Sequence, residues 1–81
     1  MQANEWINEN GWGEAKNLIA ASGWRNTPFL IKIKRLVESY DFVSEHGGIE
    51  RCKDWYKSSP FKRDKYMREL KQAIADVESC Q

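Results

Sequence analysis

Few side chains in this 81-residue chain could do chemistry, and those few lack the neighbours that chemistry requires. His46, the only histidine, has no histidine partner at i, i+4 spacing and belongs to no Ser-His-Asp arrangement. Its place just before Gly47-Gly48 predicts that it ends a helix, where a ring that can carry a proton suits the negative helix end. A zinc site built from His46, Cys52 and Cys80 would lack a fourth ligand. The sequence therefore predicts neither an enzyme nor a metal or cofactor site.

The remaining candidates have structural explanations. The Gly-Trp-Gly of residues 11–13 has no basic residue at phosphate-loop spacing and is typical of a helix end.

The N-terminus lacks a signal peptide, and the longest apolar stretch, residues 28–31, is far shorter than a membrane-spanning helix. We therefore expect a cytoplasmic protein that does not enter a membrane, with its two cysteines as free thiols.

Helix signals dominate the chain, and no segment alternates polar and apolar residues as a half-buried strand does. We predict one all-α domain over residues 1–81, with two long and about three short helices. Thr27-Pro28 and Ser59-Pro60 each read as an N-cap followed by a proline in the first helical turn. The short helices are expected at about 4–10, 13–22 and 48–57, and the long ones at about 28–46 and 60–79.

Each long helix carries an apolar stripe with the spacing of a helix that packs along another helix. The two stripes could pack against each other, against a second chain, or both. They offer more apolar surface than three short helices readily cover, and a symmetric dimer is the commonest remedy, so we expect a homodimer. The residues assigned to its interface are Phe29, Ile33, Leu36, Tyr40, Met67, Leu70, Ile74 and Val77.

A short pattern occurs twice. Residues 6–18 and 42–55 each contain an apolar pair, a glycine and a second helical segment, offset by 36 and then 37 residues. An offset of this size is typical of helical repeats, in which each unit buries its apolar face against its neighbour. An imperfect internal duplication is therefore a hypothesis, and it concerns architecture alone.

The net charge of +1 is unevenly distributed. Residues 50–71 hold eight basic and four acidic side chains, whereas residues 1–24 hold one basic and three acidic. The basic segment could be a surface for an acidic partner or only the solvated faces of helices. The basic residues assigned to partner binding are Arg51, Lys53, Lys57, Lys62, Lys65 and Arg68.

The four tryptophans are many for so small a chain. They could form the core of the short-helix clusters, or some of them could belong to an interface, where tryptophan carries much of the binding energy. Trp12 and Trp24 are the two assigned to partner binding, because both stand beside glycines in turns and outside the stripes.

Short helices joined by glycine turns also resemble a helix-turn-helix, so a small DNA-binding regulator is the alternative function. Its recognition helix would be the segment 48–57 with Arg51, Lys53 and Lys57, or the segment 13–22 with Lys16 and Asn17. A net charge of +1 gives only a small phosphate attraction unless the protein dimerises, which favours a protein partner instead.

Two stretches, LVESYDFVSEHGGIE (36–50) and LKQAIADVES (70–79), resemble small helical proteins of lambda-like temperate bacteriophages and prophages. More loosely, the chain is similar to accessory products of the early region between the exonuclease and excisionase genes. The resemblance covers about a third of the chain and supplies no site motif, so no functional residue is transferred. It implies a non-enzymatic accessory protein in the host cytoplasm, which regulates host or phage processes by binding a host or phage protein.

Overall fold

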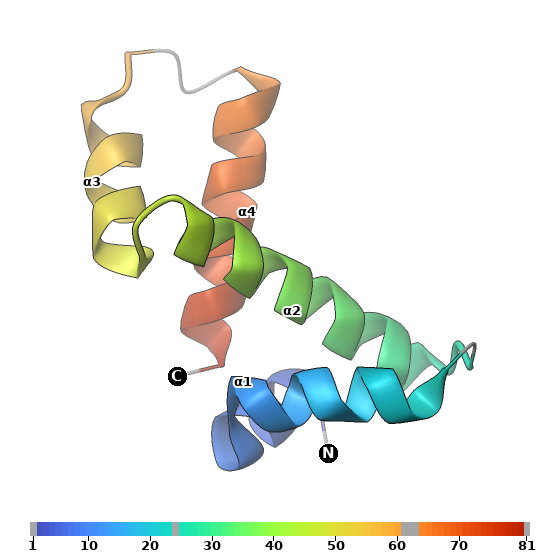
Figure 1. Cartoon of the computed structure of the whole chain (residues 1–81). Coiled ribbons are helices and arrows are strands. Elements are labelled where there is room, and N and C mark those ends of the chain that lie inside the picture. Colours follow the sequence, from blue (N-terminus) through green and yellow to red (C-terminus); the bar gives the residue numbers. More distant parts are fainter. Residues whose placement is uncertain (1, 24, 61–63, 81) are drawn as a thin grey trace.

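The computed structural model describes residues 2–23, 25–60 and 64–80, and over those ranges its regular structure is entirely α-helical. The helices are α1 (Ala3–Ser22), α2 (Pro28–Glu45), α3 (Ile49–Ser58) and α4 (Lys65–Ser79) (Figure 1). The all-α prediction is confirmed. The expected number of about five helices is wrong, because the segments predicted at 4–10 and 13–22 run on as one kinked helix.

The kink in α1 lies at Gly11. Its φ of 89° and ψ of 165° fall in a region that is open almost only to glycine, whereas the rest of α1 is helical. The change of direction lets Ile7, before the kink, and Ala15, after it, both join the same buried cluster. Gly11 thus has a positive φ at the point where the sequence predicted a helix end, but the chain changes direction there and continues as the same helix.

The ends of α2 follow the sequence signals. Thr27 is the N-cap, its Oγ1 accepts a hydrogen bond from the Leu30 N–H at 3.3 Å, and Pro28 occupies the first turn. His46 is the C-cap, as its position predicted. The chain then leaves the helix through two glycines with positive φ, and the Gly48 N–H donates to the Val43 carbonyl at 2.9 Å.

The start of α4 differs from the prediction. Ser59 does not cap a new helix; it ends α3, because its N–H donates to the Trp55 carbonyl at 3.0 Å. The last helix begins instead at Lys65, where the Asp64 carboxylate accepts a hydrogen bond from the Tyr66 N–H at 2.9 Å. An aspartate at the N-cap satisfies a helical N–H that has no partner within the helix.

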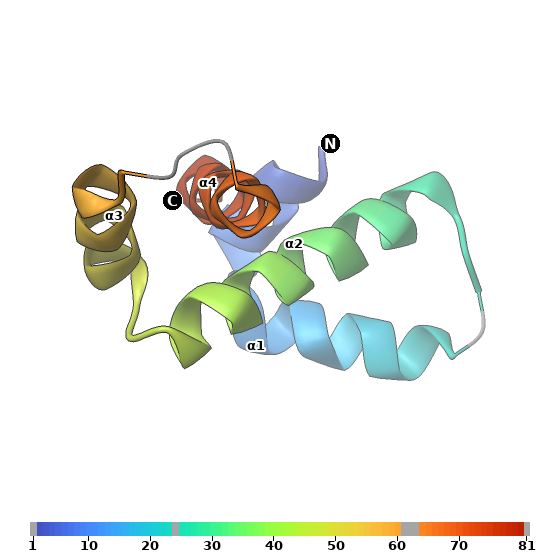
Figure 2. The ribbon, with the colours of Figure 1, turned by 90° about the horizontal axis from the view of Figure 1, so that it is seen from above.

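α2 is packed on two sides, with α1 along one of them and α4 crossing the other (Figures 1 and 2). One buried cluster joins α1 to the first part of α2, and a second joins the end of α2 to α3 and α4. Trp12 packs against both clusters. Its ring stacks on Tyr40 of α2, with the centroids 4.4 Å apart. This pair therefore lies where the two halves of the core meet.

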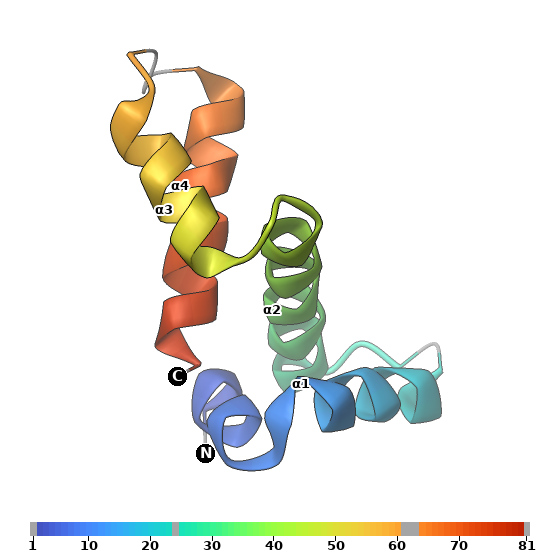
Figure 3. The ribbon, with the colours of Figure 1, turned by 60° about the vertical axis from the view of Figure 1, so that its left-hand side comes forward.

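The two clusters give the molecule one long dimension, 41 Å against 22 and 21 Å. α3 and α4 lie side by side and run in opposite directions (Figures 1 and 3). At its other end α4 reaches the start of α1, where the Asn4 side-chain amide donates to the Ser79 carbonyl at 3.2 Å. Cys80 is buried there in the α1–α2 cluster. The last helix thus contacts all three of the others.

The crossing of α2 and α4 contains a buried carboxylate, that of Asp76, which is 7% exposed. It accepts hydrogen bonds from Ser39 Oγ at 2.7 Å and from Gln72 Nε2 at 2.9 Å. Arg35 Nη2 approaches the same carboxylate at 3.3 Å and forms an ion pair with it. A buried charge is tolerated only when it is paired and hydrogen-bonded, and these three donors meet that condition.

The proposed duplication is matched in local geometry alone. Both copies place a glycine of positive φ between two helical segments, Gly11 in the first and Gly47-Gly48 in the second. The first copy is a kink within α1, whereas the second is a complete turn between α2 and α3. A common origin of the two segments stays a hypothesis.

Two glycines of α1 should respond oppositely to alanine. Gly11→Ala should lower the free energy of unfolding by about 1–3 kcal/mol, because its backbone conformation is strained for any other residue. Gly13→Ala should raise it by about 0.5–1 kcal/mol, because Gly13 is helical and a Cβ there meets no atom within 4 Å. Urea denaturation measures both, and equal effects would contradict the kink.

The Asp76 network should be needed for stability. Asp76→Ala should lower the free energy of unfolding by about 1–3 kcal/mol, because its donors on α2 and α4 lose their acceptor. Asp76→Asn keeps one oxygen acceptor and should cost less. Glu69→Ala, an exposed position on the same helix, is the control and should change stability by under about 0.5 kcal/mol. An Asp76→Ala protein as stable as the control would show that the network does not stabilise the fold.

Candidate functional site

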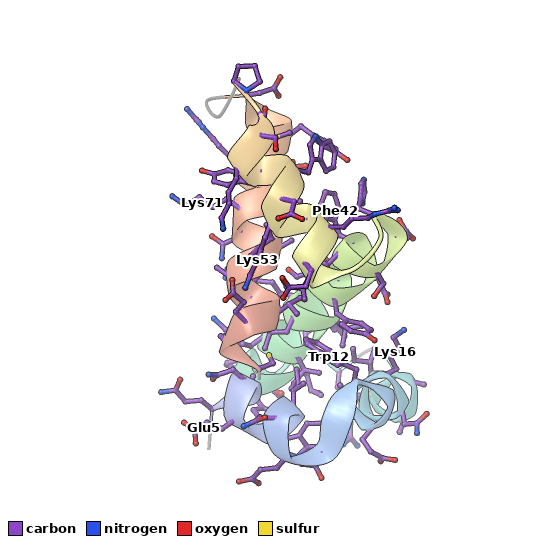
Figure 4. All side chains as sticks on the ribbon, turned by 90° about the vertical axis from the view of Figure 1, so that its left-hand side faces the viewer. Glu5, Trp12, Lys16, Phe42, Lys53 and Lys71 are labelled. Atoms are coloured by element: carbon purple, nitrogen blue, oxygen red, sulfur yellow. The ribbon has the colours of Figure 1, made fainter. Side chains whose placement is uncertain are left out.

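A surface groove of about 390 Å³ lies between α3 and α4. α3 contributes three of its side chains, at the i, i+3 and i+4 positions Lys53, Tyr56 and Lys57. The facing side chains from α4 are Lys71, Ile74, Ala75 and Glu78. Figure 4 shows Lys53 and Lys71 on the same flank of this helix pair. We call this feature the α3–α4 groove.

The groove combines an apolar floor with a basic rim. Its apolar lining comes from Tyr56, from Ala75 and from Ile74, of which 8% stays exposed. Three lysines and one glutamate surround it. Lys53 Nζ is paired with Glu78 Oε2 at 3.2 Å, with 33% and 44% of the two side chains exposed. An ion pair this exposed contributes little to stability, so its main effect is to hold Lys53 across one end of the groove.

Only some of the basic residues that were assigned to partner binding line the groove. Lys53 and Lys57 line the groove, whereas Arg51, Lys65 and Arg68 are exposed but lie outside its lining. Lys62 lies outside the described residues.

Four groove residues were missed: Tyr56, Lys71, Ala75 and Glu78. Their signal was present in the sequence, because positions 53, 56 and 57 share one helical face and positions 71, 74, 75 and 78 share another. The spacing alone could not show that the two faces would meet.

Of the two tryptophans assigned to partner binding, the structure describes Trp12 alone. Trp12 is half-buried in its stack with Tyr40, and Figure 4 shows it beside Lys16 at the junction of α1 and α2. Trp24 lies outside the described residues. The tryptophan with the greatest described exposure is Trp55, at 39%. Trp12 therefore contributes to the packing of the core.

The residues assigned to a dimer interface lie inside the single chain. The structure buries Ile33, Leu36, Met67, Leu70, Ile74 and Val77, because α4 folds back across α2 and the two stripes pack within the chain. Phe29 is half-buried against Trp6. Tyr40 is half-buried against Trp12. In the single chain the two stripes thus pack mainly against each other, one of the arrangements that the sequence left open. Self-association, and the assignment of these residues to its interface, stay predictions.

An aromatic cluster surrounds His46 where α2, α3 and α4 meet. The imidazole stacks on Phe42 with centroids 4.4 Å apart and on Trp55 at 5.6 Å. Its Nδ1 is hydrogen-bonded to the Phe42 carbonyl at 2.7 Å, and its Nε2 to the Tyr66 hydroxyl. Both ring nitrogens are therefore engaged within the fold, which fits the structural role that the helix end predicted.

The two cysteines are buried free thiols that belong to different clusters, Cys52 to the α2–α3–α4 cluster and Cys80 to the α1–α2 cluster. Burial raises the pKa of both thiols above the ordinary value of 9.0. A nucleophilic cysteine needs the opposite shift, so neither thiol resembles an activated one. No three or more His, Cys, Asp or Glu side chains come together as metal ligands within the described ranges.

Some of the basic side chains expected to contact DNA form ion pairs within the chain. Lys16 Nζ pairs with Asp41 at 3.0 Å and lies 5.6 Å from the centre of the Tyr40 ring. Arg51 and Lys57 are exposed on α3, while Lys53 is paired with Glu78.

In the part of the chain that the structure describes, no helix is both long and apolar enough to cross a membrane.

Comparison with known proteins gives no match to any family, curated protein or solved structure.

Alkaline pH should weaken the contribution of Cys52 to stability. Because its pKa is raised in the folded chain, the native state favours the protonated thiol, and this contribution is complete below about pH 9.0. It is lost as the pH rises through the folded-state pKa. The free energy of unfolding of the wild type minus that of Cys52→Ala should therefore be constant from about pH 7 to 8.5 and fall above about pH 9. A difference that is flat to about pH 10.5 would contradict the burial effect.

Proposed function

We propose that this chain is a non-enzymatic regulatory protein that binds a protein partner through the α3–α4 groove. The observation that carries the proposal is the combination, in one surface groove, of an apolar floor with Lys53, Lys57 and Lys71 around it. Protein interfaces take their energy from apolar contacts at the centre and their specificity from charges around them. The groove offers both in one place.

The wider setting follows from the resemblance of residues 36–50 and 70–79 to small phage and prophage proteins. We propose an accessory protein of phage or prophage origin whose partner is a host or phage protein in the bacterial cytoplasm. A small accessory protein of this kind acts by occupying a surface of a larger protein. That mode of action needs a docking groove and no catalytic group.

A matched pair of charge reversals tests the docking surface. The groove triple changes Lys53, Lys57 and Lys71 to Glu, and the control triple changes Arg51, Lys65 and Arg68 to Glu. Both remove three positive charges, but only the first alters the groove. With the tagged protein as bait in a bacterial lysate, a specific partner should be captured by the wild type and the control triple. The groove triple should lose it by roughly tenfold or more, because like charges would face an acidic partner.

DNA binding predicts a different result in a gel shift at about 150 mM salt. Phosphate attraction follows total charge, so both triples should then weaken binding similarly. We expect the wild type to bind duplex DNA weakly and without sequence preference. Sub-micromolar, sequence-selective binding by the wild type would contradict docking and support the DNA-binding alternative. Capture that is equal for the wild type and the groove triple would exclude the groove as the docking surface.

A further inference from the structure

The chemistry of the groove indicates which partner fits it. We propose that the α3–α4 groove receives an acidic amphipathic helix of another protein, with apolar side chains on the floor and carboxylates at Lys57 and Lys71. This inference rests on the proposed docking function and adds the class of ligand. Three features support this inference: the volume of the groove, the charge at one of its ends and the arrangement of its two helices.

The floor has room for more than one apolar side chain. A buried apolar cavity of about 150 Å³ is large enough to bind benzene. The groove, at about 390 Å³, could therefore hold roughly two groups of that size. Tyr56, Ile74 and Ala75 present a ring and aliphatic carbon there, and these surfaces gain free energy when they are covered by apolar groups. A single extended polar segment would leave that gain unused.

The charge of the rim is concentrated at one end. α3 and α4 run in opposite directions, so the end of α3 and the start of α4 lie at the same end of the pair, where the chain makes its connection (Figure 3). The paired Lys53 and Glu78 therefore lie at the end far from this connection. Lys57 and Lys71 lie nearer to it, and neither forms an ion pair with any residue that the structure describes. Among the described residues, this end thus carries two exposed positive charges that can pair with carboxylates from outside the chain.

The shape of the groove suits a helix. α3 has 10 residues and is roughly 15 Å long, which is nearly three helical turns. A helix laid along the groove would present apolar residues three and four positions apart to the floor, the recurring way in which a groove recognises an amphipathic helix. Acidic residues beside this apolar row would then reach Lys57 and Lys71. Nucleic acid would make less use of the site, because a phosphate backbone gains nothing from an apolar floor.

The test uses synthetic peptides of defined chemistry. The probe is a stapled helical peptide of about 14 residues, with leucine and phenylalanine on one face and glutamate on the others, carrying a fluorophore. One control peptide has the same composition in scrambled order, and a second replaces every glutamate with lysine. Fluorescence anisotropy gives the dissociation constants, and amide chemical shifts locate the contact. We expect the acidic amphipathic peptide to bind at least roughly tenfold more tightly than either control and to shift Tyr56, Lys57, Lys71 and Ala75.

Two variants of the protein separate the floor from the rim. Ala75→Phe fills the floor without changing the charge, and Lys57→Glu with Lys71→Glu reverses the open end without filling the floor. Ala75, Lys57 and Lys71 are exposed, so both variants should fold, which circular dichroism verifies. Each should weaken binding of the acidic peptide by roughly tenfold. The control, Lys65→Glu with Arg68→Glu, has the same charge change outside the groove and should bind as the wild type does.

Several outcomes would overturn the inference. Equal binding of the acidic and scrambled peptides, or no effect of Ala75→Phe, would mean that charge alone is recognised. Tighter binding of duplex DNA or of anionic lipid vesicles, dependent on Lys57 and Lys71, would assign the groove to another class of ligand. If the lysate capture depends on the groove while the acidic peptide does not bind, the docking function stands and the acidic-helix ligand is wrong. If neither the lysate capture nor the binding of the acidic peptide depends on the groove, the docking function and the acidic-helix ligand are both wrong.

Discussion

The fold depends on α2 being buried along two sides at once. Ile33 and Leu36 pack in the cluster with α1, and Val43 packs in the cluster with α3 and α4. The position of α4 across α2 is defined by Asp76, whose carboxylate is satisfied by donors from both helices. If α4 moved along α2 by one turn, this carboxylate would keep Gln72 but lose its two donors on α2, Arg35 and Ser39, at a cost of about 1–3 kcal/mol. Apolar packing alone would discriminate less between these registers.

This crossing determines where the groove can form. The buried face of α4 is too wide for α2 to cover alone. It includes Met67, Leu70, Ala73, Ile74 and Val77. α3 covers the remainder through Cys52 and Tyr56, but it is shorter than α4. The outer edge of α4, at Ala75, stays accessible beside Tyr56, next to the buried Ile74. The groove thus lies along the line where α3 and α4 share one apolar face.

Much of the helical content was predictable, because a helix boundary depends on its own residues. Thr27-Pro28 and the glycines at 11, 47 and 48 have the roles that local stereochemistry predicts. The stripes were also predictable, but whether they meet within one chain or between two depends on contacts between distant residues. For the same reason the sequence did not single out Asp76, whose donors Arg35 and Ser39 lie on another helix. The groove could not be predicted from the sequence either, since Lys57 and Lys71 come to line one groove only when α3 and α4 pack together.

The lysines also explain how an apolar groove can persist on the surface of a small protein. An uncovered apolar surface favours indiscriminate association, and charges around it oppose any partner of like sign. Lys57 and Lys71 would repel a second copy that approached with its own groove, because the same positive charges would meet. They attract an acidic surface by the same interaction. The rim therefore acts against pairing of two copies groove to groove and in favour of an acidic partner.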